Sequence, residues 1–119
     1  MVIVIGRIRA REGSVEVVEE AARTVIAHTR QEDGVVEYEF FQDPADPRSF
    51  TIVEVWSDAD TFASHTGTQA LADFRAAVYP VLDERDVKVF DAEQRVSADL
   101  ETLIEANRQT RKEAHAPAP

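Results

Sequence analysis

Two segments of this chain are rich in β-branched residues and apolar on both of their faces. In residues 2–10, Val4 and Ile8 would share one face of a strand while Ile5 points to the other. Residues 50–57 repeat this pattern. A strand that is apolar on both faces has to be covered on both sides. This requirement constrains the possible folds more than any other feature of the sequence.

The apolar periodicity predicts four strands and three helical regions. Strands are expected at residues 2–10, 35–42, 50–57 and 86–96, and helices from Ser14 to about residue 31, from residue 59 onward, and from Ser97 to about residue 115. Gly67 should interrupt the second helical region, which resumes at Thr68, and Pro80 should end it because proline lacks an amide donor. Two prolines and two aspartates in residues 43–49 predict a turn, so the second and third strands should form an antiparallel hairpin.

The predicted order is βαββαβ followed by a C-terminal helix, which is the ferredoxin-like pattern within the α+β class. We expect one domain over residues 1–96, and a helical extension with a frayed tail over residues 97–119. The two main helices of such a fold cover the same face of the antiparallel sheet. The opposite face would expose more apolar surface than a monomer usually tolerates, so two sheets packed face to face in a homodimer are expected. The C-terminal helix could cover part of this surface or reach over the partner.

Charge and cysteine content exclude several classes of function. The formal net charge of −10 disfavours nucleic acid and anionic membrane surfaces as partners, because both attract basic clusters. Without cysteine the chain has no disulfides, thiolate nucleophile or thiolate metal site. Neither a signal peptide nor an apolar run long enough to span a membrane is expected, so a cytoplasmic location is the default prediction.

Residues 50–74 join a strand to a helix and hold the strongest candidates for a functional site. Trp56 is the only tryptophan, and His65 follows it by nine positions across the expected turn. A large apolar ring and an imidazole placed in this way could line one cavity. His65 has the residue type of a general base near neutral pH; alternatively, it caps the turn at Gly67 or faces solvent. Trp56 is more typical of the core or of a pocket wall than of a chemical participant.

With this order of elements, the string EVWSDADTFASH at residues 54–65 resembles the antibiotic biosynthesis monooxygenase family of dimeric α+β barrel proteins. Its recognisable parts are the E-x-W triplet, the capped helix ending in histidine, the short turn after it, and Phe74. The segment GVVEY at residues 34–38 is also similar to the family. The resemblance covers roughly residues 2–95 and leaves the C-terminal helix outside.

The resemblance implies oxidation of a small electron-rich aromatic, such as a quinol or anthrone, by molecular oxygen without metal, flavin or haem. The protein would need a dry aromatic pocket, a base, and donors for the developing oxyanion. Two features depart from the family pattern. Many relatives carry a second histidine and a phenylalanine where this chain has Ala70 and Leu71, and haem-degrading relatives use a first-strand asparagine, whereas Asn107 is the only asparagine here.

Further candidates surround these two residues. Glu54 shares a strand face with Trp56; it could act as a base with a raised pKa if that face looks into a pocket, or pair with Arg7 or Arg9 across a dimer interface. Other expected pocket residues are Tyr38, Tyr79, Phe62, Phe74 and Arg75. The tyrosines could donate hydrogen bonds to a bound oxygen atom or pack at the rim, and Arg75 could hold an anionic substrate or remain solvated.

The leading hypothesis is therefore a cofactor-independent, homodimeric monooxygenase with His65 and Glu54 as catalytic residues. The alternative is a ligand-binding or stress-responsive dimer of the same fold without catalysis. A metal site is not expected, because no H-x-x-x-H or H-x-x-E-H arrangement occurs, and four glycines provide no phosphate-binding loop.

Overall fold

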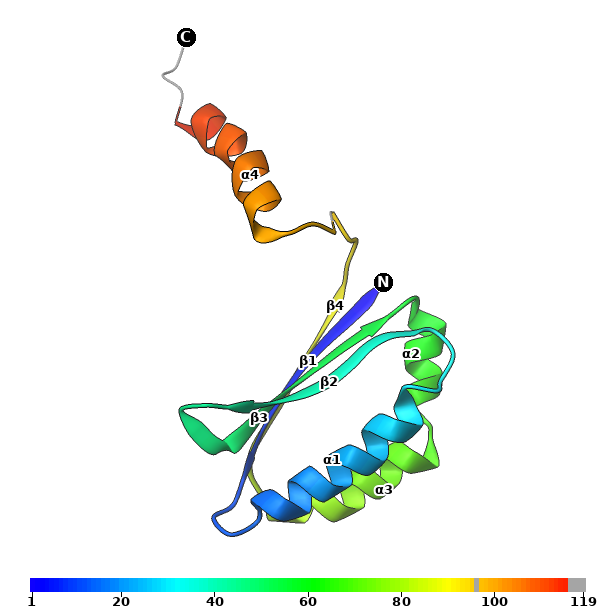
Figure 1. Ribbon diagram of the computed structural model, residues 1–119. Coiled ribbons are helices and arrows are strands. Elements are labelled where there is room, and N and C mark those ends of the chain that lie inside the picture. The colour runs from blue at the N-terminus through cyan, green and yellow to red at the C-terminus, as the bar shows by residue number, and fades with distance from the viewer. Residues whose placement is uncertain (96, 116–119) are drawn as a thin grey trace.

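A four-stranded antiparallel sheet with helices on one face forms the body of the protein (Figure 1). The computed structural model describes residues 1–95 and 97–115. The strands stand in the order β2-β3-β1-β4, which confirms the ferredoxin-like α+β prediction. In chain order the elements are β1 (Val2–Ala10), α1 (Val15–Thr29), β2 (Val35–Asp43), β3 (Asp46–Trp56), α2 (Ala59–Thr66), α3 (Gln69–Val78), a 3₁₀ turn (Tyr79–Val81), β4 (Leu82–Asp91) and α4 (Leu100–Ala114).

The central strand β1 pairs with β3 on one side and with β4 on the other. Val4 and Ile8 are buried under the helices, as the alternation predicts, while Arg7 and Arg9 point to the opposite face. The same alternation in β3 places Glu54, the register partner of Val4, on the helix side. We call this the helix-covered face; the other, which has no helix on it among the described residues, is the open face (Figure 1).

The interruption of the second helical region occurs where the sequence predicts it. Gly67 caps the end of α2, and the Thr68 hydroxyl accepts a hydrogen bond from the Leu71 amide to begin α3. At the start of α2, the Asp58 carboxylate accepts a hydrogen bond from the Thr61 amide, and this bond lowers the pKa of Asp58. Ser14 precedes α1 as expected, but its side chain makes no capping hydrogen bond.

Three predicted boundaries are wrong. The turn expected at residues 43–49 is shorter, since β3 already begins at Asp46; Pro47 is tolerated there because β1 pairs with β3 only as far as Ser49. Strand β4 runs over Leu82–Asp91 rather than residues 86–96, of which residue 96 lies outside the described residues. As an edge strand it accommodates the charged side chains of residues 83–85, which precede the predicted strand. Asp99, not Ser97, caps α4. The tail expected at residues 116–119 lies outside the described residues.

Gly34 joins α1 to β2 in a conformation that other residues adopt with strain. Its φ angle is +78°, and an added Cβ would overlap the side chain of Thr61 on α2. We therefore expect Gly34→Ala to lower the free energy of unfolding by roughly 1–3 kcal/mol, measured by urea denaturation. Gly13→Ala is the matched control, because Gly13 also has a positive φ but nothing lies within 4 Å of its added Cβ. Equal losses in the two variants would contradict a contribution from the Thr61 overlap.

Candidate functional site

A cavity of about 500 Å³ opens between the helix-covered face of the sheet and helices α2 and α3. Of the eight site residues predicted from the sequence, seven line it: Tyr38, Glu54, Phe62, His65, Phe74, Arg75 and Tyr79. Strands β2 and β3 contribute the first two, and the helical region contributes the others. Trp56 is the exception, because it is fully buried behind the cavity wall.

His65 lies at the centre of a buried polar cluster. Only 2% of its surface is exposed, so it does not face solvent. Its Nδ1 is 3.0 Å from Glu32 Oε2, and its Nε2 is 3.6 Å from Glu54 Oε1. An ionised carboxylate only accepts hydrogen bonds, so the shorter contact has Nδ1–H donating to Glu32 and leaves Nε2 facing Glu54. This arrangement orients the imidazole between two acidic side chains.

Trp56 supports this cluster from behind. Its indole Nε1–H donates a hydrogen bond of 3.0 Å to Glu54 Oε1. The Trp56 ring also packs against the imidazole of His65, with 4.7 Å between the ring centroids. Trp56 therefore holds both candidate catalytic side chains in place without contributing to the cavity lining.

Burial raises the pKa of the Glu54 carboxyl above its ordinary value. The hydrogen bond from Trp56 and the charge of His65 act in the opposite direction, while the charge of Glu32 adds to the rise. A carboxylate that is less stabilised than in water accepts a proton more readily. Glu54 thus has the environment expected of a general base. Its position on the helix-covered face also rules out the alternative pairing with Arg7 or Arg9, which lie on the open face.

The two tyrosines of the site lie in different environments. Tyr38 is buried, with its ring centroid 5.4 Å from that of His65, and burial raises the pKa of its hydroxyl well above the ordinary value. Tyr38 therefore stays protonated near neutral pH and can donate a hydrogen bond. Tyr79 is partly exposed at the rim, where the guanidinium of Arg85 stacks over its ring.

Glu32 and Arg85 contribute charges to the site and were not predicted. Glu32 follows α1, and its sequence context is that of a solvated residue near a helix end. It approaches His65 only because the fold brings together two residues that are 33 positions apart. Arg85 falls in a segment that the periodicity placed before the fourth strand. In the sequence, only the charge of Glu32 and of Arg85 could have indicated a role in the site, and many surface residues are also charged.

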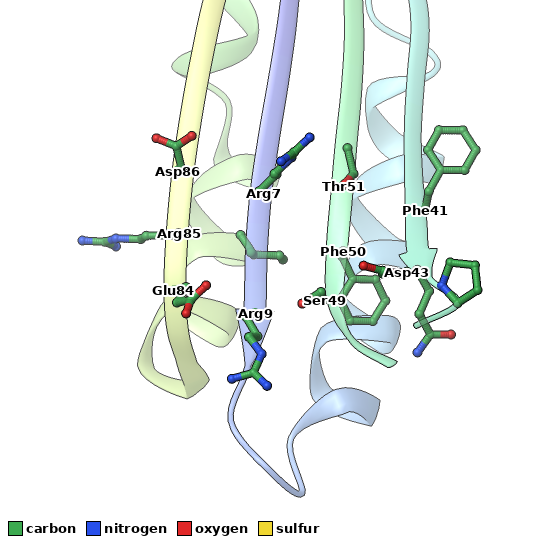
Figure 2. A pocket seen from close by; sticks show the side chains of 13 residues that line it. Arg7, Arg9, Phe41, Asp43, Ser49, Phe50, Thr51, Glu84, Arg85 and Asp86 are labelled. Atoms are coloured by element: carbon green, nitrogen blue, oxygen red, sulfur yellow. The ribbon is translucent and has the colours of Figure 1, made fainter. Parts of the chain in front are cut away.

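A second cavity, of about 710 Å³, lies toward the lower end of the sheet as drawn and is lined in part by open-face residues (Figure 2). Figure 2 shows Arg7 and Arg9 on β1 with Thr51 on β3, and the helices behind the sheet. Of the described residues that line this cavity, none is a histidine. Arg9 is already paired with Asp46, at 2.9 Å. We therefore place the candidate site in the smaller cavity, where a buried histidine meets two carboxylates.

Neither a metal cluster nor a spanning helix is found in the described residues. Within residues 1–95 and 97–115, no three His, Asp or Glu side chains are arranged to hold a metal ion. None of the helices described is long and apolar enough to cross a membrane.

The fold and site are those of a ferredoxin-like domain with a pocket between sheet and helices. A sequence model described as antibiotic biosynthesis monooxygenase matches residues 1–77 of the 119 in the chain. The chain belongs to this family. The match ends within α3, so β4 and α4 lie beyond it. No match was found among curated proteins.

Solved structures support the same fold. Rv0793 from Mycobacterium tuberculosis is 23% identical, with a TM-score of 0.74, over 81% of this chain and 98% of that one. PA3566 from Pseudomonas aeruginosa is 25% identical, with a TM-score of 0.72, over 78% and 94%. A third structure, described as an antibiotic biosynthesis monooxygenase, is 24% identical, with a TM-score of 0.73, over 79% and 100%.

Proposed function

We propose that this protein is a cofactor-independent monooxygenase that oxidises a small aromatic, of the quinol or polyketide type, with molecular oxygen. Family membership supports a monooxygenase-like function in general. The observation that carries the finer proposal is the buried Glu54–His65–Glu32 cluster facing a cavity with aromatic walls. We propose Glu54 and His65 as the catalytic residues, with Tyr38, Phe62, Phe74, Arg75 and Tyr79 forming the substrate pocket and Trp56 positioning the base.

The proposed reaction needs no reactant other than the substrate and molecular oxygen. For an anthrone-type CH₂ group, Glu54 removes one proton and the resulting carbanion passes an electron to O₂. The radical pair combines to a peroxide, which loses water and leaves a carbonyl, so that CH₂ and O₂ become C=O and H₂O. In this proposal the Tyr38 hydroxyl donates a hydrogen bond to the developing oxyanion, and His65 receives the proton from Glu54 through Nε2, which is 3.6 Å from Glu54 Oε1.

The proposal includes a homodimer in the cytoplasm, formed through the open face of the sheet. That face carries Ile3, Ile5, Val53 and Val55 from the two central strands, together with Phe90, which is 47% exposed. A second copy packed on this face would remove the apolar side chains from water. Light scattering of the full chain at micromolar concentration should give about twice the monomer mass of 13.3 kDa. A monomeric mass would contradict the sheet-packing argument.

Oxygen uptake tests the proposed activity. We expect uptake above the autoxidation background when the protein is mixed with menadiol or with an anthrone. His65→Ala should lower the rate by roughly 10²–10⁴-fold, the usual contribution of acid–base groups. His115→Ala is the matched control, since His115 is an exposed residue at the end of α4. If a folded, dimeric protein shows no uptake across a panel of reduced quinones, the alternative of a non-catalytic binding protein is favoured.

A further inference from the structure

Two arginines from different parts of the chain line the rim of the 500 Å³ cavity. Arg75 lies on α3 and Arg85 on the edge strand β4. The guanidinium carbon of Arg85 is 4.2 Å from the centroid of the Tyr79 ring, and Tyr79 follows Arg75 by one helical turn. Figure 2 shows Arg85 extending outward from the edge strand, away from Arg7 and Arg9 on the open face. The fold thus brings two cations and an aromatic ring to one end of the cavity.

Among the described residues, neither of these arginines is engaged by a carboxylate. Within the part of the chain that the structure describes, no Asp or Glu oxygen lies within 4 Å of the guanidinium nitrogens of Arg75 or Arg85, whereas Arg9 and Arg30 have acidic partners at 2.9 and 2.7 Å. Asp86, which also borders the cavity, accepts a hydrogen bond of 2.9 Å from Lys88. The pair is therefore available to an anion, in a chain whose formal net charge is −10.

The charges of the cavity are separated along its length. Glu54 and His65 are largely buried against Trp56, whereas Arg75 and Arg85 are exposed where they border the cavity. A ligand with an acidic hydroxyl at one end and an anionic group at the other would complement both. We propose that the substrate is an aromatic carboxylate, bound with its carboxylate at Arg75 and Arg85 and its oxidisable ring toward Glu54. This inference rests on the proposed function, because it concerns the same site.

The shape of the cavity agrees with such a ligand. Phe62 and Phe74 provide apolar walls, and Gly6 of β1 lies in the lining without a side chain. Glycine inside a strand often marks a place where a ligand approaches the backbone closely. A cavity of about 500 Å³ is of the size that holds a small organic ligand. Stacking on Tyr79 orients the planar guanidinium of Arg85, which suits two-point recognition of a carboxylate.

Isothermal titration calorimetry with two ligands of the same shape tests the proposal without requiring turnover. We expect 6-hydroxy-2-naphthoate, which carries its hydroxyl and its carboxylate at opposite ends, to bind the wild-type protein roughly 10- to 100-fold more tightly than 6-hydroxy-2-naphthamide. Arg85→Gln and Arg75→Gln should each reduce this preference, and the double variant should abolish it. Arg23→Gln, an exposed residue of α1, is the control with the same change of charge.

Equal affinity for the two ligands, binding of neither, or a preference that survives in the double variant would overturn the proposal. Its failure is distinguishable from failure of the proposed function. Selective binding of the carboxylate without oxygen uptake on 1,4-dihydroxy-2-naphthoate would support the anion site and contradict the oxidation. Oxygen uptake on neutral quinols without any preference for the carboxylate would support the oxidation and contradict the anion site.

Discussion

Replacing Glu54 by glutamine should lower kcat roughly 10²–10⁴-fold while leaving the protein folded. The amide has nearly the shape of the carboxyl group and can accept the hydrogen bond from Trp56 Nε1–H through its oxygen. It has no basic oxygen, so the proposed removal of a proton from the substrate is lost. Oxygen uptake with a quinol panel measures the effect. Glu20→Gln on α1 is the matched control because Glu20 is exposed and outside the cavity.

Glu54→Gln should also raise the free energy of unfolding at pH values above the acidic range. The folded-state pKa of Glu54 is raised, so its ionised form is less favourable in the folded protein than in the unfolded chain. Wild type therefore loses stability relative to Glu54→Gln as the pH rises from the ordinary value of 4.5 through the folded-state value. Thermal unfolding at several pH values measures the difference. A variant that is less stable than wild type at pH 7 would contradict the unfavourable burial of the ionised carboxylate.

Truncating Trp56 should have the largest effect on stability. Trp56 is the last residue of β3, and its fully buried side chain packs against the rings of His65 and Phe62. Trp56→Ala should cost roughly 3–5 kcal/mol, through lost contacts and the cavity left behind. Natural domains have only about 5–15 kcal/mol of net stability, so this loss is a large fraction of the total. Urea denaturation followed by far-UV circular dichroism measures the loss.

Trp56→Phe separates the hydrogen bond from the packing. Phenylalanine fills much of the same space but has no N–H group, so Glu54 loses an interaction that lowers its pKa. The pKa of Glu54 should rise further, and the pH at which activity appears should move upward with it. The pH profile of kcat/KM measures the shift. An unchanged profile in the folded variant would show that Glu54 is not the titrating base.

The alternation of apolar residues was sufficient to predict the main architecture. In β1 and β3 it predicts which residues share a face, and the position of Gly67 predicts where the second helical region is interrupted. Glu54 was correctly placed beside Trp56, because two residues separated by one position on a strand point the same way. Each of these features depends on residues that are close together in the chain, so the order of residues is sufficient to predict it.

The tertiary structure decided three features that the sequence did not predict. These are the approach of Glu32 to His65, the start of β4 at Leu82, and the stacking of Arg85 on Tyr79. Each depends on how separate segments pack, and none is specified by the pattern of its own segment. An edge strand pairs on one side only and so tolerates charged residues, which an apolar alternation does not identify as a strand. A glutamate after a helix becomes part of a buried cluster only when the helix and the sheet bring it to a histidine. The sequence by itself determined the order of strands and helices, the helix break and which residues share a strand face. Packing decided which face borders the pocket and which charges complete the site, because such contacts form between residues far apart in the chain.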